Sequence, residues 1–195
     1  MKKGIDVSAI QGSIDWRNVF HEVDFAWIKT SEGSTIVDSR AQENARSCDV
    51  LNIPWGVYHF AYPQKKHNDA LDEIAAFKAV MKELPVPTLG FALDLENNPD
   101  AMEPREYLGW VTTFIGGAKD LFSDSQIYIY GSPNFLNNHL PAGHGVGKYK
   151  LWLADYIDPS MSPDIPGGWD DWSIWQYGTD IVSGIDSAVD VDKMR

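Results

Sequence analysis

WGVYHF at residues 55–60 and LGFALDL at residues 89–95 are two short apolar runs. Between them, apolar side chains recur at the spacing of one helix face: Ala70, Ile74, Phe77, Met81 and Leu84. Two apolar runs of strand length on either side of an amphipathic helix form the repeating unit of a mainly parallel sheet. This stretch therefore predicts an α/β protein.

The same alternation extends in both directions from this unit. Further strands are expected at residues 4–7, 25–29, 126–130, 151–156, 172–177 and 189–191, and helices are expected to open at Asp15, Ser39, Pro104 and Ser132. In the second of these helices, Ser39 and Gln42 have the spacing of a capping box. The last three strands are joined by loops rich in Pro and Gly that leave no room for full helices.

About eight strands and five helices indicate an irregular TIM-like barrel, which would form a single catalytic domain over residues 1–195. An open doubly wound sheet is the structural alternative. In a barrel, polar residues at the carboxyl ends of the strands converge on one mouth, where barrel enzymes place their active sites.

Composition excludes several classes of protein. The net charge of −12 argues against a nucleic-acid partner, because nucleic-acid affinity depends largely on Lys and Arg that neutralise phosphates. The chain starts without the apolar run of a secretory signal, and no stretch approaches the roughly 20 apolar residues of a membrane span. The single cysteine, Cys48, cannot form an internal disulfide. We expect a soluble monomer that binds no membrane and needs no cofactor or metal.

The strongest chemical feature is the pair of carboxylates in Asp94-Leu95-Glu96, at the end of the strand that begins at Leu89. Residues i and i+2 of a strand point to the same face, so both carboxylates would face the mouth, with α-carbons roughly 6.5 Å apart. Glycoside cleavage needs such a pair, with one carboxyl protonated and the other ionised. The pattern therefore indicates a glycoside hydrolase.

Two other interpretations of these carboxylates remain open. Asp94 and Glu96 could simply begin a solvated acidic loop, or they could form a divalent metal site with Asp6 and Asp190, because hard cations favour oxygen ligands. The aromatic residues placed near the expected mouth favour a sugar ligand over a metal. Among the histidines, His59 could act as a base, but its aromatic neighbours are typical of a hydrogen-bonded wall residue.

A series of short motifs resembles glycoside hydrolase family 25, the lysozymes of the Chalaropsis type found in bacteria, fungi and phages. The motifs occur in the family's order along the whole chain: Asp6-Val7-Ser8, Gln11-Gly12, Ile14-Asp15-Trp16, Phe25 to Lys29, Ser31-Glu32-Gly33, Gly56 to Phe60, Leu93 to Glu96, Leu151 to Tyr156, Trp175-Gln176-Tyr177 and Val189 to Asp192. The resemblance implies an irregular barrel that cleaves the bond from N-acetylmuramic acid to N-acetylglucosamine in peptidoglycan.

The resemblance also implies roles for individual residues. Glu96 would be the general acid, and Asp94 would orient the substrate's acetamido group, whose oxygen attacks the anomeric carbon with retention of configuration. Asp6 and Asp190 would complete the acidic pocket. The sugar would contact Tyr58, His59, Tyr128, Trp152, Asp155 and Gln176.

One position departs from the family pattern. Asp192 stands where the family usually carries Asn, and strand alternation places Asp190 and Asp192 on the same face. Motif order alone favours Asp190 as the pocket residue.

Two other functions remain as alternatives. A chitinase-like N-acetylglucosaminidase would also end a strand in Asp-x-Glu, and an inactive wall-binding lectin would keep the aromatic residues without needing Glu96. For a lysozyme, the partner would be the glycan strands of bacterial peptidoglycan. The protein would then be made in the cytoplasm and act on the cell wall after holin-type lysis.

Overall fold

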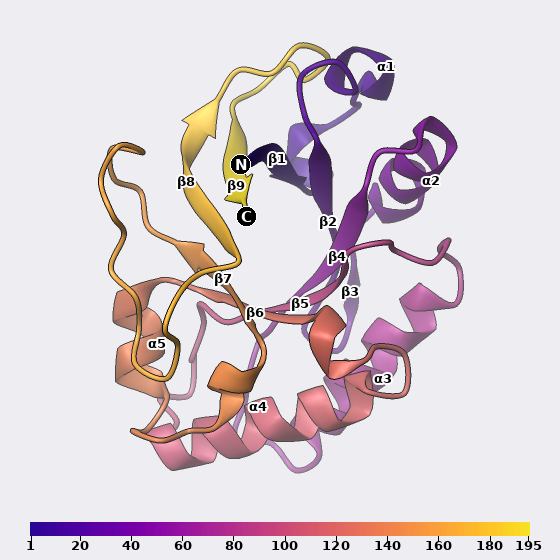
Figure 1. Ribbon diagram of the computed structural model, residues 1–195. Coiled ribbons are helices and arrows are strands. Elements are labelled where there is room, and N and C mark those ends of the chain that lie inside the picture. The colour runs from indigo at the N-terminus through magenta and orange to yellow at the C-terminus, as the bar shows by residue number, and fades with distance from the viewer.

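The computed structural model describes residues 1–195 and contains one sheet of nine strands in the order β1-β9-β8-β7-β6-β5-β4-β2-β3. An additional pairing of β1 with β2 closes eight of these strands into a barrel, while β3 extends β2 at one end (Figure 1). The strands are β1 (Lys2–Val7), β2 (Phe25–Glu32), β3 (Ile36–Val37), β4 (Trp55–Phe60), β5 (Gly90–Asp94), β6 (Ile127–Gly131), β7 (Lys150–Ala154), β8 (Ile174–Asp180) and β9 (Val189–Met194). The expected irregular α/β barrel is confirmed.

Five α-helices lie outside the barrel (Figure 1). They are α1 (Trp16–Val19), α2 (Ala41–Leu51), α3 (Asp69–Met81), α4 (Pro104–Ala118) and α5 (Pro133–His139), with short 3-10 turns η1 (Ala9–Gln11), η2 (Asp124–Gln126) and η3 (Val146–Lys148). No α-helix follows β7, as the loops rich in Pro and Gly predict. None of the helices is both long and apolar enough to cross a membrane.

Helix starts follow their local sequence in three of four cases. Asp15 caps α1 by accepting a hydrogen bond from the Arg17 amide. Ser132 caps α5 by accepting a hydrogen bond from the Phe135 amide, and Pro104 occupies the first turn of α4. The capping box expected at Ser39 is wrong: α2 has Arg40 at its N-cap position and no side-chain cap there. Asp38 instead accepts from the Arg40 amide at 2.9 Å and from the Ala9 amide at 2.8 Å, so one carboxylate joins this turn to η1.

The last strand runs against its neighbours. β1, β2 and β4 to β8 pair in parallel, whereas β9 is antiparallel to both β1 and β8. The amino end of β9 therefore lies at the carboxyl ends of the others, and Asp190 pairs with Asp6. The chain termini lie beside each other at the opposite end of these two strands, where Lys2 pairs with Met194 (Figure 1).

Large aromatic side chains fill the barrel interior. A buried cluster contains Phe25, Trp27, Tyr58, Ala92, Tyr128, Tyr130, Trp152 and Ile174. The Trp27 ring centroid lies 5.0 Å from those of both Tyr128 and Trp152. Space for these rings comes from Gly4 and Gly56, where an added Cβ would collide with Phe25 and Trp27, respectively. A larger core of 41 buried residues includes residues of both the sheet and the helices.

Candidate active site

A pocket of about 180 Å³ opens at the carboxyl ends of the parallel strands. Its acidic residues are Asp6 from β1, Asp94 and Glu96 at the end of β5, and Asp190 from β9. Its other walls come from Ser8, Ile10, Gln11, Lys29, Tyr58, Phe60, Tyr130, Trp152 and Gln176. The structure thus brings together all four carboxylates that the sequence placed at one mouth.

Asp94 and Glu96 are the two central carboxylates of the pocket, and Asp94 is the more deeply buried of them. Its side chain is 5% exposed, and its Oδ1 atom is buried without a hydrogen-bond partner. Burial, followed by the charge of Glu96, raises the pKa of Asp94 well above its usual range, while Lys29 lowers it. A carboxylate that is nearly buried and has no donor beside it is costly to ionise, so a hydrogen bond from a ligand in the pocket would favour the charged form of Asp94.

Glu96 lies two residues further along the chain and is exposed to solvent. The surrounding pocket still partly excludes water, and this desolvation, together with the charge of Asp190, raises the pKa of the Glu96 carboxyl. Lys29 has the opposite effect on it. Because both carboxyls hold protons more tightly than in water, the pair can carry one proton and one charge at a pH at which exposed carboxyls are both ionised. That is the protonation state that acid-assisted glycoside cleavage requires.

Asp6 is held by a chain of hydrogen bonds across the pocket floor. Gln176 Nε2 donates to Asp6 Oδ2 at 2.8 Å, and the Tyr130 hydroxyl donates to Gln176 Oε1 at 2.8 Å. Burial raises the pKa of Asp6 well above its usual range, and the charges of Asp192 and Asp190 add to the effect. Asp6 is therefore a fixed acceptor that binds a proton readily.

The two acidic residues of β9 lie at different depths. Asp190 lines the pocket and accepts a hydrogen bond from the Tyr156 hydroxyl, whereas Asp192 is fully buried and accepts from Trp152 Nε1 at 2.8 Å. Burial is the largest cause that raises the pKa of Asp192 to about 7. Both residues do face the barrel interior, and Asp190 is the one at the mouth.

Two predicted sugar contacts lie away from the pocket. Tyr128 is inside the barrel at its opposite end, where its hydroxyl accepts a hydrogen bond from Lys150 Nζ at 3.2 Å. His59 points to the outside of β4 and is fully buried against the helices. Its Nδ1 lies 2.8 Å from Ser31 Oγ, and its Nε2 lies 2.9 Å from Glu73 Oε2. Neither residue lines the pocket with the carboxylates.

A wider groove of about 800 Å³ adjoins the pocket and shares Glu96, Tyr130 and Gln176 with it. Asp155 lines this groove, and its Oδ2 accepts a hydrogen bond from the Asp164 amide at 3.2 Å. Because the two hollows meet at Glu96, a chain of sugars longer than one ring could pass over this carboxyl.

Sequence reasoning missed several residues at this mouth, among them Lys29, Tyr130 and Tyr156. Tyr130 could have been found, because it stands two residues after Tyr128 in the same strand and nearer the carboxyl end. Lys29 and Tyr156 lie inside the motifs that resemble the family, but the spacing of the motifs does not say which side chains turn inward. No group of three or more His, Cys, Asp or Glu side chains is placed to hold a metal ion.

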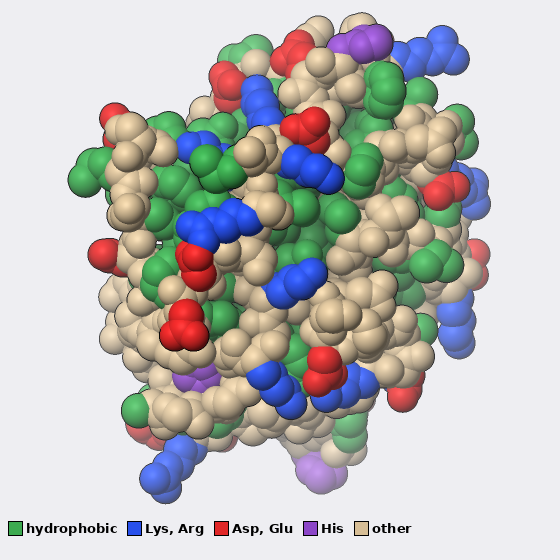
Figure 2. All heavy atoms as spheres, viewed as in Figure 1, with side chains coloured by type: hydrophobic (Ala, Val, Ile, Leu, Met, Phe, Trp, Pro, Cys, Tyr) green, Lys and Arg blue, Asp and Glu red, His purple; other side chains and the backbone are tan.

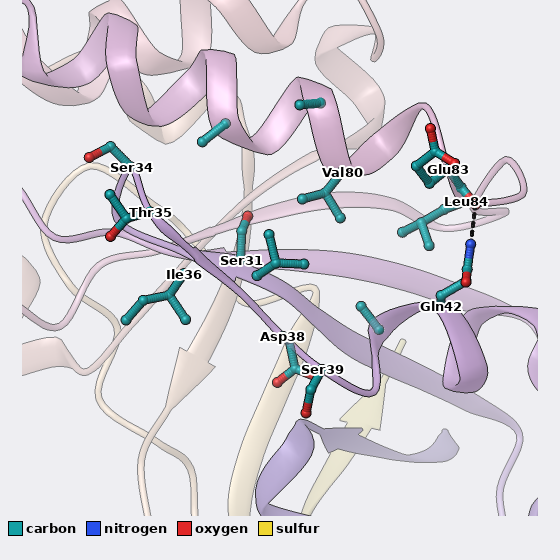
Figure 3. Close-up of a pocket in the computed structure, with 14 residues that line it drawn as sticks. Ser31, Ser34, Thr35, Ile36, Asp38, Ser39, Gln42, Val80, Glu83 and Leu84 are labelled. Carbon is teal, nitrogen blue, oxygen red and sulfur yellow. Dashed lines mark hydrogen bonds between the residues drawn. The ribbon is translucent and has the colours of Figure 1, made fainter.

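A second hollow, of about 520 Å³, lies outside the barrel between β3, α2 and α3. Ser31 and Val80 point into it, and Gln42 Nε2 donates to the Glu83 carbonyl at its edge (Figure 3). Its walls are largely small apolar side chains, and its two carboxylates, Asp38 and Glu83, stand at opposite ends (Figure 3). It lacks the paired carboxylates of the barrel mouth.

Comparisons with known proteins find the family that the sequence motifs resemble. The model of glycosyl hydrolases family 25 matches residues 5–184. Lysozyme M1 of Streptomyces globisporus is 30% identical over 201 residues, which cover 99% of this chain and 67% of that protein. The autolytic lysozyme of Clostridium acetobutylicum is 25% identical over 198 residues, which cover 98% of this chain and 55% of that protein.

Solved structures share the fold over nearly the whole chain. The bacterial lysozyme from Streptomyces coelicolor superposes with a TM-score of 0.84 at 27% identity, covering 99% of this chain and 91% of that one. The CTP1L endolysin gives a TM-score of 0.84 at 25% identity, covering 100% of this chain and 67% of that one.

Proposed function

The chain belongs to family 25 of the glycosyl hydrolases, and on this premise we propose that it is a muramidase. The bond that it cleaves is the β-1,4 bond between N-acetylmuramic acid and N-acetylglucosamine in bacterial peptidoglycan. The names of its relatives, which include lysozymes and an endolysin, support this substrate. The bacterial cell wall is then its place of action, reached from the cytoplasm after holin-type lysis.

One observation carries the mechanism: the nearly buried Asp94 carboxyl lines the pocket beside Glu96 and accepts no hydrogen bond from the protein. The acetamido group of an N-acetylated sugar supplies the missing donor, because its N–H can donate to this carboxylate. That hydrogen bond turns the acetamido oxygen toward the anomeric carbon of the same sugar. Asp94 is thus a positioning group for a nucleophile that the substrate itself provides.

Glu96 supplies and recovers the proton. As the acetamido oxygen forms its bond to the anomeric carbon, the bond to the leaving glycosidic oxygen breaks and Glu96 protonates that oxygen. The Glu96 carboxylate then takes a proton from a water molecule, which attacks the anomeric carbon from the side that the leaving group vacated. Two displacements at the same carbon retain its configuration.

Substrate binding determines which of the two carboxyls, Asp94 or Glu96, holds the proton. In the unliganded pocket, the deeper burial of Asp94 favours its protonated form. A hydrogen bond from the acetamido N–H favours the ionised form of Asp94 instead, so the shared proton moves to Glu96. The acid is then ready only when an N-acetylated sugar occupies the pocket.

Digestion of purified peptidoglycan tests the proposal. We expect mass spectrometry of the reduced products to find N-acetylmuramic acid at the new reducing ends. N-acetylglucosamine at those ends would instead identify a glucosaminidase, and cleavage of chitin with no action on peptidoglycan would identify a chitinase-like enzyme. Binding without any new reducing ends would identify a lectin, and each of these three results would contradict the proposal.

A further inference from the structure

Lys29 is the only basic side chain that lines the carboxylate pocket. Its ammonium nitrogen lies 2.7 Å from Glu32 Oε2 and 4.6 Å from the centre of the Phe60 ring. The Lys29 side chain is only 16% exposed, which limits how far water screens its charge. A cation held at this depth among several carboxylates influences which of them can ionise.

An irregularity in β2 gives Lys29 this position. Lys29 pairs with Tyr58 of β4, and Ser31 pairs with the next residue, His59, so Thr30 is an extra residue between the two pairs. Its hydroxyl donates to the Tyr58 carbonyl at 3.0 Å, and its side chain is fully buried. Such a bulge turns the residues after it relative to those before it.

The faces of the neighbouring side chains confirm that β2 turns at Thr30. Residues i and i+2 of a regular strand share one face, but Lys29 lines the barrel pocket while Ser31 points outward into the hollow beside α3 (Figure 3). With the bulge, Lys29 and Glu32 reach each other at i and i+3, a spacing that a regular strand places on opposite faces. The bulge therefore builds this ion pair at the mouth.

We propose that Lys29 is a positioning residue that keeps the central pair singly charged, so that one of Asp94 and Glu96 stays ionised while the other holds a proton. Lys29 lowers the pKa of both carboxyls against the effect of burial. Glu32, which anchors the ammonium group, itself raises the pKa of Asp94, so the anchor alone cannot produce the ionised state.

The other titratable groups around the pocket do not share the effect of Lys29 on the pKa values of Asp94 and Glu96. From the strands around the pocket they are Asp6 of β1, Glu32 of β2, Tyr58 of β4, Tyr130 of β6, and Asp190 and Asp192 of β9. His59 lies on the outer face of β4, and Lys29 lowers its pKa as well. Lys29 is thus the one cation that lines the pocket together with Asp94 and Glu96.

The proposal rests on the muramidase function and is tested by the pH dependence of kcat/KM on purified peptidoglycan. In Lys29→Met, both limbs of the pH profile should move to higher pH by about one unit, with roughly 10-fold lower activity on the acid side, because a nearby cation lowers carboxyl pKa values by that order. Lys29→Arg keeps the charge and should keep the limbs. Lys150→Met, which removes a lysine at the opposite end of the barrel, is the matched control for the loss of one positive charge.

Two results would overturn the proposal: a uniform loss of activity at every pH in Lys29→Met, or a higher KM with unmoved limbs, which would assign Lys29 to substrate contact. Lys29→Gln provides the same comparison if the methionine variant unfolds. Product identity from the peptidoglycan digest is read separately, so failure of this proposal is distinguishable from failure of the muramidase assignment.

Discussion

Asp6 at the pocket wall and Asp192 behind it bring two carboxyl groups close together from strands that pair directly. Asp192 Oδ2 is buried with no hydrogen-bond partner, while its Oδ1 is held by Trp152. Neither carboxyl ionises as it would in water: burial raises both pKa values, and the charge of Asp192 raises that of Asp6 further, although the contact with Asp6 lowers that of Asp192. The protein therefore keeps a proton in this pair under conditions in which an exposed aspartate has lost it.

This arrangement gives stability a defined pH dependence. The pKa of Asp192 is about 7 in the folded protein and about 4 when unfolded, so between these values the folded state binds more protons. Stability contributed by the protonated form is present near pH 4 and is lost as the pH rises toward 7. Asp192→Asn keeps an acceptor for Trp152 and removes the charge. We expect it to stabilise the protein by on the order of 2 kcal/mol at pH 8.

Denaturant unfolding at several pH values measures this difference. The gain from Asp192→Asn should shrink as the pH is lowered and should vanish near pH 4. A gain that is equal at pH 4 and pH 8 would show that Asp192 does not hold a proton in the folded protein.

At the scale of the secondary-structure elements, Ser31, His59 and Glu73 link β2, β4 and α3 through buried hydrogen bonds. Burial lowers the pKa of His59 to about 3 and raises that of Glu73 to about 8, so the two side chains form a neutral hydrogen-bonded pair near pH 6. The Tyr62 amide also donates to Glu73, which fixes the loop after β4. The network supports the strand that carries Tyr58 into the pocket.

His59→Leu tests whether this residue is structural. The variant removes the buried hydrogen bonds of Glu73 and Ser31 to the imidazole and should lose about 3 kcal/mol of unfolding free energy, while KM for peptidoglycan stays unchanged. Adding Glu73→Leu removes the carboxyl that lost this partner and should restore part of the loss. A raised KM in folded His59→Leu would instead support the sugar contact that the family motif implies.

The element pattern was predictable from sequence because each strand and each long helix has its own apolar periodicity. The direction of each strand and its local register could not be predicted in this way. The reversal of β9, which brings Asp190 to the mouth, depends on pairing with β1, and the bulge at Thr30 depends on pairing with β4. Neither leaves a periodic signal in its own strand. The helix start at Ser39 was mispredicted because Asp38, one residue earlier, makes the tertiary contact with Ala9 that decides the turn.

For the candidate site, the four carboxylates could be predicted from their places at strand ends. The depth at which each side chain lies in the barrel could not be predicted. Tyr128 and Tyr130 share one face of β6, but the sequence does not show that the first contacts Lys150 at the far end while the second reaches Gln176 at the mouth.

At the scale of the whole molecule, the barrel is a packed structure that leaves space only at its mouth. Hydrophobic side chains occupy the centre of the face seen in Figure 2, with Lys and Arg side chains among and around them. Inside, aromatic rings take the space that glycines leave free, so the interior has little tolerance for added volume.

Gly56→Ala tests this packing. The added methyl group would overlap the Trp27 ring, and we expect a loss of about 1–3 kcal/mol in unfolding free energy. Gly109→Ala is the matched control, because a Cβ at this exposed position of α4 meets nothing within 4 Å. It should stabilise the helix by about 0.5–1 kcal/mol. Equal effects of the two substitutions would contradict a tightly filled interior.

The measurement that tests the central claim most directly is the activity of Glu96→Gln on two substrates. One is purified peptidoglycan, whose leaving oxygen needs a proton, and the other is an aryl glycoside of N-acetylmuramic acid whose acidic phenol leaves without one. As the general acid, Glu96 predicts a loss of roughly 10³-fold in kcat on peptidoglycan and a far smaller loss on the aryl glycoside. Near-normal cleavage of peptidoglycan by folded Glu96→Gln would contradict the assignment of Glu96 as the acid.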